Sequence, residues 1–253
     1  MLLENRFVQP DSVRPTSFLP LTGTGENALH VLYTDARSGV GTGTVLDGFI
    51  IVGGNADLSG QRDGGGFCNW SGSPTIRNCT FAANSANFYG GAICIGKGAA
   101  PRISQCVFGW NYSTSDGAGL YSEGASPRLE NCLFTSNNAN YDGGGMVLDS
   151  YCSAVLSECT FQHNYARYDG AGMYLNWVCS ATIEDCRFFA NRADGDGGGM
   201  YSGNHCSPRI DGCEFTGNQA RSGGGIVNEF NCSPWIVDSI ILGNAAGEGA
   251  GLA

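Results

Sequence analysis

The sequence has no apolar run near the roughly 20 residues that a membrane-spanning helix needs, so no such helix is predicted. Basic residues are scarce: 13 Lys and Arg stand against 23 Asp and Glu, for a formal net charge of −10. This balance excludes nucleic acids as partners, because basic side chains bind the phosphate backbone. The twelve cysteines include no C-x-x-C pair, which excludes the usual zinc motifs.

Helical patterning is also missing. Gly-Gly-Gly at 143–145, 197–199 and 223–225 would interrupt any helix. The apolar runs are short and rich in β-branched and aromatic residues, as in Ala181-Thr182-Ile183. These features predict an all-β chain.

One pattern recurs between Thr75 and Leu252. Its cysteines are separated by 27, 26, 27, 27 and 27 residues, and a Phe column and an Asn column keep the same period. The columns are Cys79, Cys106, Cys132, Cys159, Cys186 and Cys213; Phe81, Phe108, Phe134, Phe161, Phe188 and Phe215; and Asn84, Asn111, Asn137, Asn164, Asn191, Asn218 and Asn244. A fixed period of this length is typical of stacked repeat folds.

Each unit supplies only two or three short strands, which cannot bury an apolar face alone. Stacked at about 4.8 Å, however, successive units pair in parallel and place like residues in ladders. The sequence therefore predicts a right-handed parallel β-helix, a solenoid of about eight rungs of 26–27 residues. The Phe column and the Met/Ile/Leu column would fill its core, and the Asn amides would donate to one another along the stack.

Two regions are predicted. Residues 1–43 would form an irregular N-terminal segment with a cap and first strand, and residues 44–253 the repeat domain. The opening residues 1–6 lack the basic-then-apolar order of a signal peptide, so none is predicted in this chain. The unit at 234–253 stops where earlier units continue into a strand, so the domain is expected to extend beyond the C-terminus in a longer parent.

The paired motif within the repeat resembles that of a known family. Phe81-Ala82-Ala83-Asn84 with Gly90-Gly91-Ala92-Ile93, and Phe134-Thr135-Ser136-Asn137 with Gly144-Gly145-Met146, are similar to the repeats of the chlamydial polymorphic outer membrane proteins. The resemblance implies a right-handed parallel β-helix on the bacterial surface or outside the cell, where understood family members act as adhesins.

An acidic column lies four residues before the Met/Ile/Leu column. Asp142, Asp169 and Asp196 occupy three consecutive rungs, where stacked carboxylates repel unless a cation lies between them. Calcium takes oxygen ligands of this kind, so these residues form the candidate calcium site. The alternative is that the Asp-Gly pairs occur because both residues favour turns, and that the Asp side chains point into water.

Two further sets are candidate ligand-binding residues. Tyr121, Tyr174 and Tyr201 share a column and would form an exposed strip that stacks on sugar rings. The alternative is ordinary cross-strand packing. Arg102 and Arg128 begin consecutive units and would be neighbours that bind an acidic sugar, or else line a solvated sheet edge.

The cysteines form two columns. The first, which begins at Cys79, is predicted to be buried as free thiols. The second comprises Cys152, Cys179, Cys206 and Cys232 and is predicted at a turn, with its thiol or disulfide state open.

Catalytic signals are weak, because His30, His163 and His205 share no column. The sequence favours a non-catalytic surface or secreted protein, acting in adhesion or as a stalk that presents a binding face. Its partners would be glycans or host or cell-surface proteins, calcium is the candidate cofactor, and a monomer is expected. The alternatives are a carbohydrate-active enzyme, either a polysaccharide lyase or a glycoside hydrolase, and a purely structural spacer.

Overall fold

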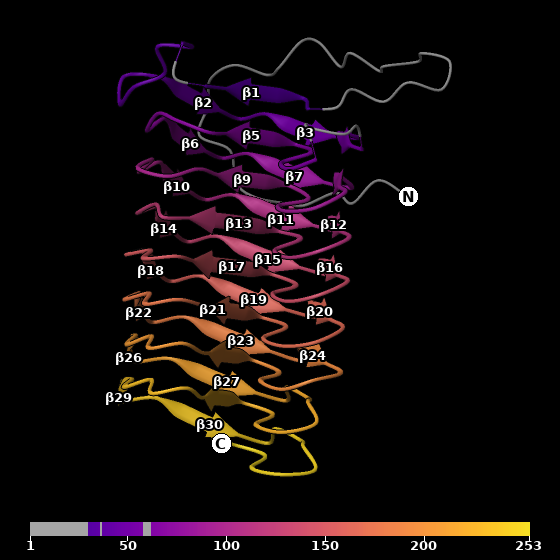
Figure 1. Cartoon of the computed structure of the whole chain (residues 1–253), viewed down its shortest axis with the longest axis vertical. Coiled ribbons are helices and arrows are strands. Elements are labelled where there is room, and N and C mark those ends of the chain that lie inside the picture. The colour runs from indigo at the N-terminus through magenta and orange to yellow at the C-terminus, as the bar shows by residue number, and fades with distance from the viewer. Residues whose placement is uncertain (1–29, 36, 58–61) are drawn as a thin grey trace.

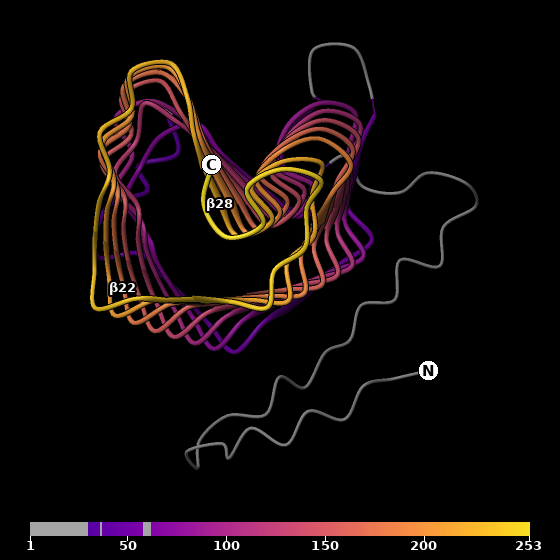
Figure 2. The ribbon, with the colours of Figure 1, turned by 90° about the horizontal axis from the view of Figure 1, so that it is seen from below.

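The chain winds into a parallel solenoid in the computed structural model, which describes residues 30–35, 37–57 and 62–253 (Figure 1). The described part contains 30 strands and no helix, hence no helix that is long and apolar enough to cross a bilayer. Successive coils contribute strands to sheets A, B, C and D in turn. Seen along the axis, sheets B, C and D form three sides of the coil and sheet A folds inward on the fourth (Figure 2).

Sheets A and B have eight strands each. Sheet A consists of β1 (Leu32–Thr34), β5 (Phe67–Asn69), β9 (Ile93–Ile95), β13 (Leu120–Glu123), β17 (Met146–Asp149), β21 (Met173–Leu175), β25 (Met200–Ser202) and β28 (Ile226–Asn228). Sheet B consists of β2 (Val45–Asp47), β6 (Thr75–Arg77), β10 (Arg102–Ser104), β14 (Arg128–Glu130), β18 (Val155–Ser157), β22 (Thr182–Glu184), β26 (Arg209–Asp211) and β29 (Trp235–Val237).

Sheet C also has eight strands, and sheet D has six. Sheet C consists of β3 (Ile50–Val52), β7 (Thr80–Ala82), β11 (Val107–Gly109), β15 (Leu133–Thr135), β19 (Thr160–Gln162), β23 (Arg187–Phe189), β27 (Glu214–Thr216) and β30 (Ile240–Leu242). Sheet D consists of β4 (Asn55–Ala56), β8 (Ser85–Ala86), β12 (Tyr112–Ser113), β16 (Asn138–Ala139), β20 (Tyr165–Ala166) and β24 (Arg192–Ala193).

The predicted all-β parallel β-helix is therefore confirmed. Seven complete turns separate β1 from β28, so the predicted count of about eight rungs differs by one. Most of the predicted N-terminal segment, residues 1–29, lies outside the described residues, and the division at residue 43 stays a prediction. β1 lies within the predicted N-terminal segment, which was expected to contain a first strand, and β2 and β3 lie at the start of the predicted repeat domain.

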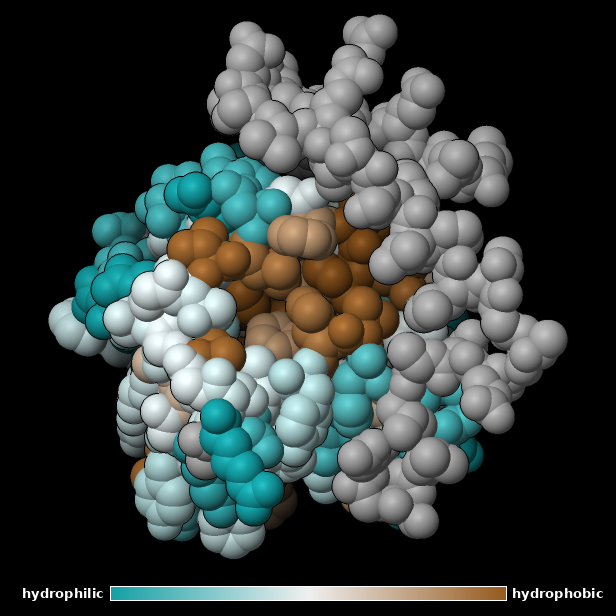
Figure 3. All heavy atoms as spheres, turned by 90° about the horizontal axis from the view of Figure 1, so that it is seen from above, coloured by the Kyte–Doolittle hydropathy of each residue, from teal (hydrophilic) through white to brown (hydrophobic). Residues whose placement is uncertain are grey.

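The core is built from the predicted columns. The Phe rings from Phe81 to Phe215 are fully buried and stack face to face, with centroids 4.4–5.3 Å apart and interplanar angles of 2–8°. The apolar atoms fill the inside of the coil behind a polar outer layer (Figure 3). The first cysteine column is buried among them as free thiols.

The Asn column joins each coil to the next. The Asn137 side-chain amide donates to Asn164 Oδ1 at 3.0 Å and to the Phe108 carbonyl at 2.9 Å. The backbone N–H of Asn137 donates to the same Oδ1 at 3.1 Å. Because the pattern repeats along the stack, the predicted amide ladder is confirmed, and it satisfies the buried polar groups of the turn that follows sheet C.

Single residues make the corners between sheets. Asn131, Glu158 and Asp185 have φ of 49–53° between sheets B and C, and Trp110 has φ 54° between sheets C and D. This left-handed conformation lets one residue turn the chain sharply, but it strains residues other than glycine.

Replacement of one ladder amide tests this account. We expect Asn164→Ala to lower the free energy of unfolding by about 3 kcal/mol, because it leaves several buried donors and acceptors unpaired. Asn138→Ala, at an exposed strand position, is the control and should change stability by less than about 0.5 kcal/mol. Equal effects of the two variants in denaturant titrations would contradict the ladder.

Candidate functional site

The outer face of sheet A holds the predicted tyrosine column. Tyr121, Tyr174 and Tyr201 alternate with core residues, so their rings point away from the core. Tyr121 and Tyr201 are nevertheless only 5% exposed, and Tyr174 is partly buried. The predicted exposed strip is therefore wrong at two of its three members, and it is interrupted by Val147, which lies in register between Tyr121 and Tyr174.

Turn glycines cover this face. Gly170 has a φ of +61°, and a Cβ placed on it would lie 2.8 Å from the Cβ of Tyr174. Gly117 and Gly197 lie against Tyr121 and Tyr201 in the same way. The turn that leads from sheet D into sheet A thus packs on the tyrosines, and burial raises the pKa of Tyr121. Stacking also removes ring surface from solvent, with 5.1 Å between the Tyr174 and Tyr201 centroids.

Acidic residues accept hydrogen bonds from the tyrosine hydroxyls. Tyr121 donates to Asp149 Oδ2 at 3.0 Å, and Tyr201 donates to Glu229 Oε2 at 2.8 Å. Neither acid was predicted from the sequence as a partner of the tyrosines. Asp149 lies two residues after Val147 in β17, and alternation along a strand puts those two side chains on the tyrosine face.

A second carboxylate lies beside Asp149. Glu123 is its register partner on β13, and Lys97 forms an ion pair with Glu123 at 2.9 Å. Asp149 Oδ1 is buried and has no hydrogen-bond partner in the described part of the chain. The two carboxylates, Lys97 and the Tyr121 hydroxyl together form one polar cluster on the outer face of sheet A.

The acidic column caps the turn between sheets D and A. The backbone N–H of Asp169 donates to Asp142 Oδ1 at 2.9 Å, and that of Asp196 donates to Asp169 Oδ1 at 2.7 Å. Arg221 closes the row with two hydrogen bonds to Asp196 of 2.9 and 3.1 Å. Asp142 and Asp169 therefore bind backbone of the next coil, and Asp196 binds a side chain of that coil, instead of pointing freely into water.

The calcium site stays a prediction. One oxygen of Asp142 and one of Asp169 are engaged with backbone, and both oxygens of Asp196 are engaged with Arg221. Across residues 30–35, 37–57 and 62–253, no group of three or more His, Cys, Asp or Glu side chains is arranged to hold a metal ion.

The arginine pair lies elsewhere. Arg102 and Arg128 are register partners on β10 and β14 and are exposed, as predicted. They lie on the outer face of sheet B, because the buried Ile103 and Leu129 follow them. The structure therefore brings the two arginines together but does not bring them to the tyrosines of sheet A.

Exposed aromatic side chains lie on the turns beside sheet A. On the turn between sheets D and A, Tyr141 and Tyr168 stack at 4.9 Å and are 52% and 44% exposed. On the turn between sheets A and B, Tyr151, Trp177 and Phe230 are 72%, 54% and 60% exposed. The two turns stand on either side of the inward-folded sheet (Figure 2).

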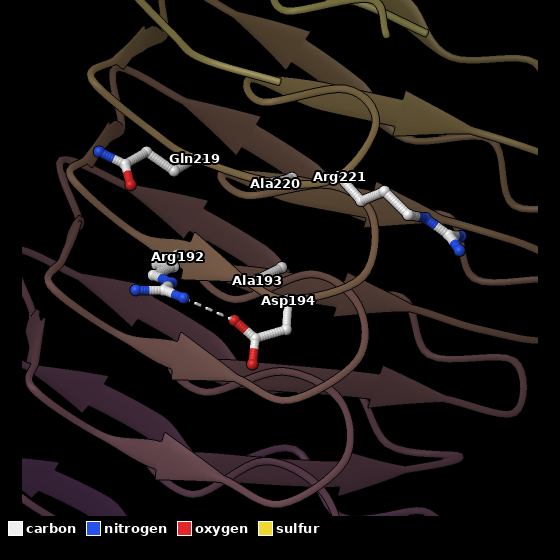
Figure 4. A pocket seen from close by; sticks show the side chains of 6 residues that line it. All are labelled: Arg192, Ala193, Asp194, Gln219, Ala220 and Arg221. Carbon is white, nitrogen blue, oxygen red and sulfur yellow. Dashed lines mark hydrogen bonds and ion pairs between the residues drawn. The ribbon is translucent and has the colours of Figure 1, made fainter. Parts of the chain in front are cut away.

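A surface depression lies on sheet D and the turn after it, and its charged side chains are already paired. It is lined by Arg192, Ala193, Asp194, Gln219, Ala220 and Arg221. Arg192 is paired with Asp194 at 3.0 Å, and Arg221 points away from that pair (Figure 4). Because Arg221 binds Asp196, both cations of the depression are already neutralised.

Burial makes the acidic column sensitive to pH. It raises the pKa of Asp142 from 3.8 to about 7. The folded state therefore binds this proton more tightly than the unfolded state does. The stabilisation is complete below pH 3.8 and is lost as the pH rises through about 7.

Asp142→Asn keeps the acceptor for the Asp169 N–H and removes the buried charge. We expect it to raise the free energy of unfolding at pH 8 by on the order of 2 kcal/mol and to have little effect at pH 4. Glu130→Gln, which removes an exposed carboxylate, controls for net charge. A stability gain at pH 8 that persists unchanged at pH 4 would contradict this assignment.

Comparison with known proteins adds the fold family. The model of the family described as right-handed β-helix region matches residues 64–245, which is more than half of the chain. Comparisons with curated proteins and with solved structures give no match.

Proposed function

The chain belongs to the right-handed β-helix family, and from this premise we propose that it is a non-catalytic binding scaffold. Its rigid coils present side chains at regular intervals to an extended partner. The binding partners are glycans at a cell surface, and the role is adhesion or the presentation of a binding face. Fold alone does not determine this role, because β-helices serve several functions.

The exposed aromatic side chains on the turns beside sheet A carry the proposal. Exposed aromatic rings that gather on successive coils indicate an interaction surface, and flat rings suit the apolar faces of sugars. Tyr151 and Trp177 lie on neighbouring coils, and so do Tyr141 and Tyr168. The row of carboxylates between them is engaged with backbone, tyrosine hydroxyls and Lys97, which favours a structural role for most of these acids.

A location on the cell surface or outside the cell accompanies the proposal. It is supported by the resemblance of the Phe-x-x-Asn and Gly-Gly-Ala-Ile motifs to the repeats of the chlamydial polymorphic outer membrane proteins. Host or cell-surface proteins are the other class of partner that such an adhesin would bind. The calcium prediction is tested together with binding.

A glycan array probed with the purified chain tests the function. We expect binding to a restricted set of glycans, equal in calcium and in chelator if the acidic column is purely structural. Binding that requires calcium would instead support the predicted site at Asp142, Asp169 and Asp196. No binding to any glycan, with binding to immobilised cell-surface proteins, would replace the glycan proposal with a protein partner.

A glycan-cleaving enzyme is the second candidate, and the polar cluster on sheet A favours it. Glu123 and Asp149 are register partners, so their backbones are about 4.8 Å apart. Retaining glycosidases place their two carboxyl groups about 5–5.5 Å apart. Asp149, with its hydrogen bond from Tyr121, would act as nucleophile, and Glu123 as acid and base.

Release of reducing ends from neutral and acidic polysaccharides separates the two functions. The binding scaffold predicts no release above that of a Glu123→Gln, Asp149→Asn double variant. Release by the wild-type chain that this variant abolishes would establish the enzyme and reject the non-catalytic proposal.

A further inference from the structure

Four successive coils carry a strained bend between sheets A and B. Each bend contains two consecutive residues with positive φ between 50° and 65°, none of which is glycine. We call this row the bend ridge, and it consists of Ser150–Tyr151, Trp177–Val178, Asn204–His205 and Phe230–Asn231. Positive φ is unfavourable for aromatic residues and especially for β-branched Val178.

Earlier coils bend between sheets A and B at a glycine. Gly98 and Gly124 have φ of 77° and 56°, and the bend at Gly124 is one residue shorter than the bend at Ser150–Tyr151. Glycine adopts this conformation without steric conflict. The last four coils instead bend through pairs without glycine, in which Tyr151, Trp177 and Phe230 remain more than half exposed. Exposed rings gain little from packing, so core packing does not explain them.

The second cysteine column holds the bend ridge in place. Cys152 Sγ donates to the carbonyls of Ser122 and Asp149 at 3.2 and 3.1 Å. Cys179 does the same to Leu148 and Asn176, at 3.4 and 3.0 Å. Asp149 and Asn176 directly precede the first two strained pairs, so these two buried thiols fix the start of those two bends.

The cysteines occur only where the ridge occurs. Ala99 and Ala125 occupy the equivalent positions in the coils that bend at Gly98 and Gly124. The change from alanine to cysteine therefore accompanies the change from a bend at glycine to a strained pair without glycine. Backbone hydrogen bonds also run along the ridge, from Tyr151 N–H to the Trp177 carbonyl at 2.9 Å and from Val178 N–H to the Asn204 carbonyl at 2.9 Å. The result is a rigid row of exposed side chains.

Strain retained at exposed positions is typical of functional sites. On the proposed function of glycan binding, we propose that the bend ridge is the binding site, and that its ligand is a neutral glycan chain lying along the solenoid axis. Successive coils of the ridge are about 4.8 Å apart. Tyr151 is in register with Val178, and Trp177 with Asn204. The rings on neighbouring coils therefore lie in two adjacent columns, and consecutive sugar rings would stack on the two columns in turn. The Asn204 and Asn231 side chains lie within the ridge as partners for sugar hydroxyls.

Charge selects neutral over acidic glycans. Asp149 and Glu229 immediately precede two of the strained pairs, and the chain carries a formal net charge of −10. These carboxylates would repel uronic acids or sulfated sugars, whereas a neutral glycan chain would not be repelled. No arginine or lysine belongs to the ridge pairs.

Native electrophoresis through gels that contain a soluble polysaccharide tests the site. The probes are a β-glucan, a mannan and a xylan, with polygalacturonate as the acidic comparison. We expect at least one neutral polymer to retard the wild-type chain and polygalacturonate not to do so. Retardation by polygalacturonate alone would overturn the charge argument, and no retardation by any polymer, with no binding on the glycan array, would reject the proposed function itself.

Trp177→Gly and Tyr151→Gly locate the ligand. Each substitution removes an exposed ring and relieves strain, so we expect a higher midpoint of thermal unfolding together with a more than tenfold loss of affinity. A lower midpoint would show that the ring contributes to packing. Unchanged affinity would place the glycan elsewhere on the protein. Either result would overturn the proposal that the bend ridge is the binding site.

Trp110→Gly is the matched control. Trp110 is 51% exposed and has φ 54°, but it lies at the corner between sheets C and D. We expect the same gain in thermal stability as for Trp177→Gly and unchanged retardation in the gel. An equal loss of affinity in this variant would show that binding does not depend on the bend ridge.

Discussion

The hydrogen bonds of the buried Asn column are the constraint on which the structure depends. Each amide donates to the next coil and to a backbone carbonyl, while its oxygen accepts from the coil before. A shift of one residue in any coil would break this set and rotate the adjacent Phe out of the stack. The column therefore fixes the register, and the register places every outer side chain above its counterpart.

Because the register is fixed, a residue type that recurs at one outer position on several coils forms a continuous feature of the molecular surface. Because each coil repeats the same path, an exposed ring on several coils becomes a row, as at Tyr141 and Tyr168. The same rule makes the carboxylates of the acidic column neighbours, which is tolerated because Asp142 and Asp169 accept a backbone N–H from the next coil and Asp196 binds Arg221. Binding surfaces on this fold are therefore linear, and they are placed on turns where the sequence is free to vary.

The inner half of the structure could be predicted because its residues recur on successive coils. Phe134 and Asn137 stand in columns that run through at least six successive coils, and strand alternation places Phe134 in the core. Burial of Tyr121 and Tyr201 could not be predicted, since what covers them is a turn that folds over sheet A, and the path of a turn is not encoded in alternation. The hydrogen bond from Tyr121 to Asp149 depends on that same face and was missed with it.

The bend ridge lay between these extremes. Its signal was present as a coordinated change one coil later, in which Gly124 gives way to the pair Ser150–Tyr151 and Ala125 gives way to Cys152. In the sequence alone, this change resembles ordinary variation at a turn. Only the positive φ of Ser150 and Tyr151 shows that the longer bend is made of residues that disfavour this conformation.

Removal of one complete coil tests in-register stacking most directly. Deletion of residues 160–186 takes out one 27-residue period and joins Cys159 to Arg187, so that every column is restored one coil shorter. Deletion of residues 160–172 removes about half a coil and joins sheet B to sheet A. The account predicts a β-rich circular dichroism spectrum and cooperative thermal unfolding for the first variant and neither for the second. Equal folding of the two variants, or failure of the first alone, would contradict it.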